Sequence, residues 1–381
     1  MRLAYVLLSP TWGMHQYTAG LANDLTAAGH EVHLITTRGA PADRYAPAVT
    51  LHTDFTTRDR GFSLRGLAAT PTAVRSALCR LRALRPDVVH ITGAHLGNPL
   101  LLRALHRSGV PSIHTLHDLH PHAGSSYGRL LYAWNNWVLR ESDHILVHGL
   151  CWREELLRRG LAPERVVYSP LTHLFLSAAR QTALEAAQPA VTYSRSALFI
   201  GRLEAYKGLE VLVEAAARLS EPDVTVTIAG PGRLADWVHS PLPASVDYRP
   251  GLVPDDLAES LFSTCGVVVL PYIEASQSAL IAAAYFFRKP VIVTRVGALP
   301  EYVVEGETGW IAPPNDPVAL AEALSAALSD PSRLEQMGRA CRSWYDRQRA
   351  DDKQALLELY RTAESVEKPG ERGEHSGTCA W

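Results

Sequence analysis

An arginine and a lysine stand five residues apart where an apolar run gives way to an amphipathic segment. Residues 197–200 are followed by Gly201 and Arg202, and Lys207 comes just before Gly208. Beyond Lys207, apolar side chains recur at helical spacing, so the two cations should flank a loop between a strand and a helix. Backbone N–H groups that open a helix attract anions, and both cations suit phosphate oxygens. The pattern predicts a diphosphate site, with an ordinary solvated pair of cations as the alternative.

Length and composition limit the class of protein. The chain has 381 residues, of which 47% are hydrophobic and 20% charged, and its formal net charge is −2. This length allows two domains, and the near-neutral balance gives no electrostatic reason to expect nucleic acid as a partner. The apolar run after Met1 is too short for a signal peptide, no other run is long enough to span a bilayer, and the five cysteines show no paired spacing. We therefore expect a cytoplasmic enzyme without a cysteine-held metal.

The elements around the two cations follow an alternating pattern of strands and helices. Strands are expected at residues 3–9, 31–37, 87–92, 111–116, 144–148 and 165–168, with a first helix at residues 15–28. Residues 38–66 are polar and without clear periodicity, so we expect mobile loops with short elements there, beside the cleft. Such alternation is typical of a parallel sheet covered by helices.

A second series of the same kind follows residues 177–195, which we interpret as a linker. Strands are expected at residues 198–200, 224–229, 246–249, 267–270 and 291–294, helices at 254–263 and 276–287, and three helices after Asp316. The predicted fold class is α/β, with two doubly wound Rossmann-like domains facing across a cleft. The first domain is predicted at residues 1–176 and the second at 196–348. A C-terminal helix that crosses back to the first domain is expected at 349–367, and a disordered tail at 368–381.

Motifs in the second half carry a family resemblance. The Arg202 and Lys207 motif is followed by residues 228–233 (IAGPGR), 271–278 (PYIEASQS), 289–301 (KPVIVTRVGALPE) and 306–317 (GETGWIAPPNDP). In order and spacing they resemble the C-terminal domain of the GT-B glycosyltransferases, specifically the retaining family 4 group, also called glycosyl transferases group 1. The first half resembles this family more weakly, through residues 27–32, residues 115–118 and the loop around Gly13.

The resemblance implies a transferase that moves a sugar from a nucleotide-diphosphate sugar to an acceptor hydroxyl with retention of configuration. Arg202 and Lys207 would hold the diphosphate and stabilise the leaving group, and His117 would face the donor sugar. The other donor-binding residues implied are Gly13, Gly201, Gly230, Glu274, Ser276, Gln277 and Ser278, and those on the acceptor side are His15, Asp118 and His120. The co-substrate is a UDP-sugar by preference, with a GDP-sugar as the alternative, and no cofactor is expected.

Two glutamates typical of the family are replaced. Family members usually carry two glutamates separated by seven residues, the first near the donor sugar and the second on the ribose hydroxyls. Counting back from Lys289 without gaps, these positions are Ala275 and Ala283. Glu274 and the side chains at positions 276–278 are the expected substitutes, so we favour altered recognition over loss of activity. Glu301 is expected to cap the helix after Pro300.

A cluster of histidines suggests a metal site as an alternative. His114, His117, His120 and His122 lie near Asp118, and imidazole and carboxylate are typical ligands. Strand alternation explains the first two histidines, and the chain has no D-x-D motif that would hold a divalent cation on a diphosphate. We therefore expect no metal.

One apolar stripe raises the question of a membrane. Leu130, Leu131, Trp134, Trp137 and Val138 recur at helical spacing near two arginines. A packed core helix is favoured over an interfacial helix that meets a membrane.

Abundant arginine and alanine with scarce lysine fit a GC-rich genome, hence bacterial polysaccharide, glycoconjugate or natural-product biosynthesis with a carbohydrate, lipid-linked or natural-product acceptor. A non-catalytic sugar-nucleotide-binding partner and a sugar-nucleotide epimerase are the alternative functions.

Overall fold

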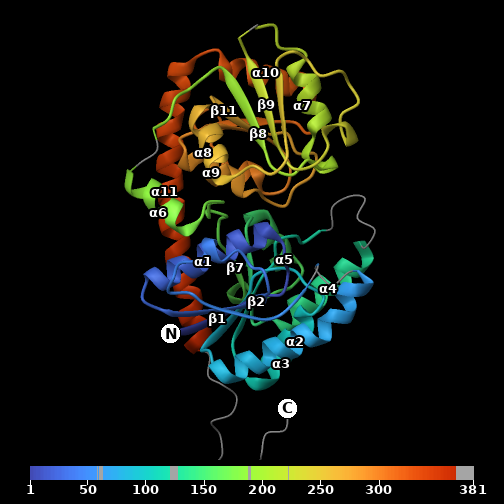
Figure 1. Ribbon diagram of the computed structural model, residues 1–381, viewed down its shortest axis with the longest axis vertical. Coiled ribbons are helices and arrows are strands. Elements are labelled where there is room, and N and C mark those ends of the chain that lie inside the picture. The colour runs from blue at the N-terminus through green and yellow to red at the C-terminus, as the bar shows by residue number, and fades with distance from the viewer. Residues whose placement is uncertain (58, 60–62, 121–127, 188–189, 222, 366–381) are drawn as a thin grey trace, which may run out of the picture.

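Two lobes are stacked along the long axis of the molecule, and one long helix runs beside both (Figure 1). The computed structural model describes residues 1–57, 59, 63–120, 128–187, 190–221 and 223–365. The expected tail at 368–381 and His122 lie outside these described residues. The predicted class, α/β with two doubly wound Rossmann-like domains, is confirmed.

The first lobe is built on a parallel sheet in the order β3-β2-β1-β4-β5-β6-β7. Every residue of its three consecutive strands β4, β5 and β6 is buried, as expected for a parallel sheet with helices on both faces. The strands are β1 Arg2–Leu7, β2 Glu31–Thr37, β3 Thr50–Phe55, β4 Val88–Ile91, β5 Ser112–Thr115, β6 His144–Val147 and β7 Val166–Tyr168. The helices are α1 Trp12–Ala27, α2 Leu64–Leu84, α3 Asn98–Ser108, α4 Gly128–Glu141 and α5 Leu150–Arg158, with 3-10 turns η1 Ala42–Arg44 and η2 Pro163–Arg165.

The second lobe repeats this design with the strand order β10-β9-β8-β11-β12-β13. Its strands are β8 Ser196–Ile200, β9 Thr225–Gly230, β10 Val246–Pro250, β11 Val267–Leu270, β12 Val291–Thr294 and β13 Gly309–Ala312. The helices are α6 Ala178–Ala187, α7 Leu209–Ala216, α8 Asp255–Thr264, α9 Ala279–Phe286, α10 Pro317–Leu328 and α11 Pro331–Ser365, with 3-10 turns η3 Ala205–Lys207, η4 Leu234–Asp236 and η5 Leu299–Tyr302. In each sheet the strand order reverses beside its first strand, β1 or β8, so both sheets offer a ligand crevice at the carboxyl ends.

Several elements differ from the sequence-based expectation. Strand β13 was not expected, whereas β3 and η1 are the short elements of the polar segment 38–66, and helix α6 lies within the segment 177–195 that we interpreted as a linker. Two helices follow Asp316 instead of three, because the chain from Pro331 to Ser365 forms one continuous helix. Gly338 lies inside this helix without breaking it, and a Cβ there would lie 2.4 Å from the carbonyl oxygen of Arg288, so the glycine allows close packing.

Helix α11 links the two lobes. Its first half packs on α9 in the second lobe, and its second half reaches β1 and β4 in the first. There the Tyr360 hydroxyl lies 2.9 Å from the Tyr5 hydroxyl and 2.6 Å from Nδ1 of His90, and Arg349 pairs with Asp24 at 2.6 Å. The expected boundary at residue 348 therefore falls within a continuous helix.

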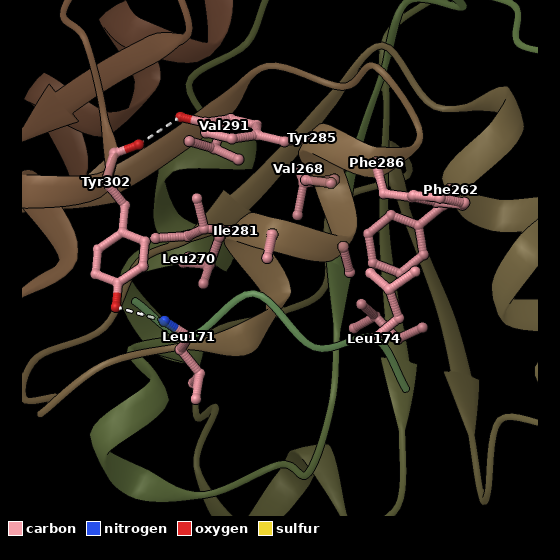
Figure 2. Close-up of a cluster of buried hydrophobic side chains, with 14 of the residues drawn as sticks. Leu171, Leu174, Phe262, Val268, Leu270, Ile281, Tyr285, Phe286, Val291 and Tyr302 are labelled. Atoms are coloured by element: carbon pink, nitrogen blue, oxygen red, sulfur yellow. Dashed lines mark hydrogen bonds between the residues drawn. The ribbon is translucent and has the colours of Figure 1, made fainter. Parts of the chain in front are cut away.

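The apolar core is continuous across the junction of the lobes. Leu171 and Leu174, which follow the first sheet, belong to the same buried cluster as Phe262, Ile281 and Tyr302 of the second lobe (Figure 2). The Leu171 N–H donates to the Tyr302 hydroxyl at 2.9 Å, as a dashed line in Figure 2 marks. Because apolar side chains of both lobes are buried in this one cluster, the cluster fixes how the lobes face each other and so shapes the cleft between them.

Candidate active site

A cleft of about 640 Å³ lies between the two lobes. Strand ends and helix starts of both sheets contribute to its walls, as expected for this class of fold. The side of the first lobe supplies Pro10, Thr11, Met14, Asp59, His117 and Asp118, and the side of the second lobe supplies Arg202, Glu204, Tyr206, Lys207, Ala275, Ser276 and Gln277. Arg202 and Lys207, predicted to act together, therefore face His117 across one cavity.

Glycines bring the backbone close together beneath the two cations. Gly208, which ends η3 and opens α7, has φ +66°, and a Cβ there would lie 1.9 Å from the Pro271 carbonyl oxygen. At Gly230 a Cβ would lie 1.8 Å from the carbonyl oxygen of Gly201. Only glycine fits at positions 208 and 230. Gly230 packs against Gly201 at the ends of β8 and β9, and both were predicted as donor-binding residues.

Arg202 is paired with a carboxylate that the sequence analysis did not single out. Its Nη1 lies 2.7 Å from Oε1 of Glu204, and its side chain remains 62% exposed. Exposed ion pairs of this kind contribute about 0 to 1 kcal/mol, so the guanidinium can exchange this partner for a ligand with more negative charge. In the sequence, the signal for this ion pair was the position of Glu204 between the two cations.

Lys207 lies against two aromatic rings. Its Nζ is 3.7 Å from the centre of the Tyr272 ring and 4.8 Å from the centre of the Tyr206 ring. Tyr272 is 1% exposed, so its ring is held firmly by the surrounding core. The two rings attract the ammonium through their π faces and limit where it can lie. In the sequence, Tyr272 was visible only as a member of the motif at 271–278.

His117 projects into the cleft from the loop after β5. Its Nε2 lies 2.9 Å from the carbonyl oxygen of Thr92, and because a carbonyl only accepts, this nitrogen donates the proton. The Tyr17 ring packs edge-on at 4.9 Å between ring centres, and the His148 ring lies at 5.2 Å. These contacts fix the imidazole on the wall opposite the two cations.

Asp118 and Ser276 join the lobes inside the cleft. The Ser276 hydroxyl donates to Oδ1 of Asp118 at 2.8 Å, and Nε1 of Trp152 donates to the Ser276 carbonyl oxygen at 3.0 Å. Next to them, Oε1 of Gln277 is buried and accepts no hydrogen bond from the described residues. A buried amide oxygen without a donor is costly, so this atom is suited to a ligand hydroxyl.

Other predicted site residues are not among those that line the cleft. His15 is buried with Nδ1 2.8 Å from the Tyr45 hydroxyl, and burial lowers its pKa to about 4. His120 lies between the Tyr132 hydroxyl and the Glu155 carboxylate, each at 3.0 Å. Ser278 caps α9 by accepting from the Leu280 N–H. None of these three is among the residues that line the cleft, and the same holds for Gly13 and Glu274.

The two alanines at the family's glutamate positions differ in their surroundings. Ala275 lines the cleft, whereas Ala283 is 1% exposed within α9 and belongs to the core. Helix α9 begins at Ala279, three residues later than expected, so Ser276 and Gln277 belong to the loop before it.

Glu301 caps a helix, but not the one expected. Its two carboxylate oxygens accept from the N–H groups of Leu150 and Cys151, at 2.6 and 2.9 Å. These residues open α5 in the first lobe, so the expectation of a cap on its own turn is wrong. A carboxylate at a helix start is favoured by the helix dipole, and here it stabilises contact between the lobes.

His114, another histidine of the cluster, lies in the core of the first lobe. His114 is buried, its Nε2 lies 3.2 Å from Nδ2 of Asn98, and burial lowers its pKa to about 3. Among the described residues, no three side chains of His, Cys, Asp or Glu are grouped so that they could hold a metal ion.

No helix within the described ranges is long and apolar enough to cross a membrane. The face of α4 with Trp134 and Val138 is buried in the core, as favoured above.

Comparisons with known proteins agree with this architecture. Residues 13–172 match the family described as Glycosyl transferase 4-like domain, and residues 194–330 match the family Glycosyl transferases group 1. The chain is 31% identical over 284 residues to glycogen synthase from Mycobacterium tuberculosis, covering 68% of this chain and 64% of that protein. It is 27% identical over 369 residues to D-inositol 3-phosphate glycosyltransferase from Gordonia bronchialis, covering 87% and 79%. The chain thus spans just under two thirds of the length of the glycogen synthase it matches.

Solved structures show the same fold at low sequence identity. Sucrose-phosphate synthase from Thermosynechococcus elongatus superposes with a TM-score of 0.74 at 20% identity, covering 96% of this chain and 100% of that one. Anabaena Alr3699/HepE in complex with UDP and glucose superposes with a TM-score of 0.70 at 15% identity, covering 96% and 100%. The two family matches together cover more than half of the chain, and the protein belongs to the GT-B glycosyltransferases of the group 1, family 4 type. The predicted family is confirmed.

Proposed function

We propose that this protein transfers a sugar from a nucleotide-diphosphate sugar to an acceptor hydroxyl with retention of configuration. The observation that carries this proposal is the placement of Arg202 and Lys207 on one wall of the cleft, opposite His117. The first lobe lines the cleft with two carboxylates, Asp59 and Asp118, whereas the second lobe lines it with two cations and one carboxylate, Glu204, so the second lobe is the favourable side for an anion. A diphosphate would therefore bind against the second lobe, with the sugar directed toward His117 and Asp118.

The proposed reaction needs no carboxylate nucleophile. The acceptor oxygen bonds to the anomeric carbon while the bond from this carbon to the phosphate oxygen breaks, and its electrons leave with the nucleoside diphosphate. The acceptor proton passes to an oxygen of the donor's own phosphate. Arg202 and Lys207 stabilise the departing charge, and the aromatic wall around Lys207 excludes water and strengthens this interaction.

We favour a UDP-sugar as donor, because the similar structures of Alr3699/HepE contain UDP and UDP-glucose. A GDP-sugar is the alternative. The polar groups of Ser276 and Gln277, beside Ala275, would bind the sugar where the family usually places a glutamate.

The proposal is tested by incubating the protein with UDP-, GDP- and dTDP-sugars without acceptor and analysing the products. A glycosyltransferase releases nucleoside diphosphate and free sugar slowly by transfer to water. Binding without release would instead support a non-catalytic partner, and an epimeric sugar would support an epimerase.

A further inference from the structure

Three imidazole rings pack against the ring of Tyr17, in α1. The tyrosine ring lies edge-on to His117, His148 and His173, with 4.9, 5.1 and 5.1 Å between ring centres. The three histidines follow β5, β6 and β7, so they come from the carboxyl ends of neighbouring strands. His117 lines the cleft, whereas Tyr17 is only 3% exposed and is not among the lining residues. Tyr17 therefore lies one layer behind the histidine that faces the two cations.

The hydroxyl of Tyr17 belongs to a buried chain of hydrogen bonds that joins α1 to the first sheet and to α11. It lies 3.0 Å from the Thr115 hydroxyl, which lies 2.8 Å from Nε2 of His90. Nδ1 of His90 is 2.6 Å from the Tyr360 hydroxyl, which is 2.9 Å from the Tyr5 hydroxyl. Burial lowers the pKa of His90 well below 6.5, so this neutral ring donates at one nitrogen and accepts at the other. Coupled buried bonds of this kind strengthen one another and hold Tyr17 in place.

The imidazole of His117 needs more than one contact to be fixed. Its Nε2 donates to the Thr92 carbonyl oxygen at 2.9 Å, which leaves the ring able to turn about this bond. The Tyr17 ring stands at 85° to the imidazole, and the His148 ring lies 5.2 Å from it. His148 is itself held, because its Nδ1 donates to the Ser169 carbonyl oxygen at 2.8 Å. Aromatic contacts of this kind contribute about 0.5 to 1.5 kcal/mol each, so they limit the turning of the ring.

We propose that Tyr17 is the positioning residue for His117. Its ring sets the plane of the imidazole, and its hydroxyl keeps the ring in place through Thr115. Because the same chain of bonds reaches Tyr360, the helix that links the two lobes also supports the active site. The effect on turnover rests on the proposed function, in which His117 faces the donor sugar. Displacing such a group by about 1 Å lowers turnover by up to about a hundredfold.

Exchange of a histidine ring proton with water tests the positioning without turnover. In the full chain labelled with isotopic histidine, the magnetic resonance signal of the Nε2 proton of His117 is the one that His117→Gln removes. Tyr17→Leu removes the aromatic ring and should accelerate exchange of this proton by up to about tenfold, the scale of one aromatic contact. Tyr17→Phe keeps the ring, so exchange should stay close to that of the wild type.

The matched control makes the same substitution in the core of the second lobe. Tyr345 of α11 is 3% exposed and packs edge-on against Phe286, and it does not line the cleft. Tyr345→Leu should lower stability but leave exchange of the His117 proton unchanged. Thermal unfolding measures the stability of each variant. If Tyr17→Leu does not fold, Tyr17→Met, which also lacks the ring but fills more of the space, takes its place with the same expected result.

Steady-state kinetics of UDP-sugar hydrolysis separates positioning from packing. Tyr17→Leu should lower kcat by about ten- to a hundredfold and change KM by less than about threefold, because the affected group acts mainly in the transition state. Tyr17→Phe should recover most of kcat, and Tyr345→Leu should retain the kcat of the wild type.

Two outcomes would overturn the proposal. One is a Tyr17→Leu variant with the proton exchange and kcat of the wild type, and the other is equal losses in Tyr17→Leu and Tyr345→Leu. If the wild type releases no nucleoside diphosphate while Tyr17→Leu still accelerates exchange of the His117 proton, the proposed transfer fails and the positioning stands. Failure of the positioning and failure of the proposed function therefore give different results.

Discussion

The ammonium of Lys207 lies 3.7 Å from the centre of the Tyr272 ring, over a side chain that is 1% exposed. Tyr272 follows β11 and is fixed by the core, whereas a lysine side chain is flexible in isolation. A cation over a buried ring gains about 0.5 to 2 kcal/mol. Tyr272 is therefore a positioning residue for the cation that we place on the diphosphate.

Replacing Tyr272 tests this positioning. Tyr272→Phe keeps the ring and should retain kcat/KM for donor hydrolysis within about threefold, since only a hydroxyl 3.5 Å from the Ser278 hydroxyl is lost. Tyr272→Leu removes the ring and should lower kcat/KM about tenfold. Steady-state kinetics with a UDP-sugar measures both, and thermal unfolding checks folding. Equal losses in the two variants would show that the ring does not position Lys207.

The hydrogen bond between Ser276 and Asp118 can be isolated by a double-mutant cycle. Ser276→Ala and Asp118→Ala each remove one partner of a 2.8 Å contact between the lobes. The coupling in the free energy of unfolding should be about 1 kcal/mol, the usual net contribution of such a bond. Urea unfolding of the wild type, both single variants and the double variant supplies the four values. Strict additivity would mean that the contact contributes nothing.

Glu301→Ala should weaken the start of α5. The carboxylate accepts from the N–H groups of Leu150 and Cys151, so its loss should cost about 1 to 2 kcal/mol. Hydrogen exchange of the amides of Leu150 and Cys151 should accelerate. A general loss of stability would instead accelerate exchange throughout the chain and not only at α5. Glu322→Ala, on the exposed surface of α10, is the control and should change stability by less than about 0.5 kcal/mol. Unaltered exchange at Leu150 would rule out the cap.

Buried histidines should make stability depend on pH. Burial lowers the pKa of His15 to about 4 and of His114 and His173 to about 3, and it lowers the pKa of His90 and His148 well below the usual 6.5. The unfolded chain therefore binds more protons below pH 6.5. Stability from these groups is fully present above pH 6.5 and is lost as pH falls toward 4, by about 1.4 kcal/mol per pH unit for each histidine.

One buried carboxylate opposes this trend. Burial raises the pKa of Asp352 to about 6, so this group favours the folded state at lower pH, below 6. With five histidines against one carboxylate, the free energy of unfolding should still fall from pH 7 to pH 5. Urea titrations at several pH values measure it, and a value that stays level or rises on acidification would contradict the account.

The buried strands could be predicted because each is a short apolar run. Strand β3, Thr50–Phe55, could not be placed within the segment where short elements were expected, because it is an edge strand in which only Phe55 is buried, so its sequence is polar. The two cations and His117 could be placed in one cleft because the family resemblance implies it and all three follow strands of the two sheets. Periodicity shows which side of an element is buried, and so it located the core of both sheets.

Partners distant in the sequence could not be predicted. Asp118 and Ser276 are 158 residues apart, and Glu301 caps a helix 150 residues earlier. No local pattern specifies such pairs, because they result from how the two lobes are packed. His15 and His120 resembled cleft residues in the sequence, but tertiary contacts with Tyr45 and Glu155 engage them elsewhere. Continuity of α11 was missed because the second domain was expected to end at residue 348, and no local pattern shows that one helix packs on both lobes.

Turnover of a nucleotide-diphosphate sugar by Lys207→Ala is the most direct test of the diphosphate site. The variant should release nucleoside diphosphate about ten- to a thousandfold more slowly than the wild type, the loss expected for one preorganised charge partner. Arg218→Ala, which removes an exposed cation outside the cleft, should leave the rate unchanged. Turnover of Lys207→Ala equal to that of the wild type would contradict the account.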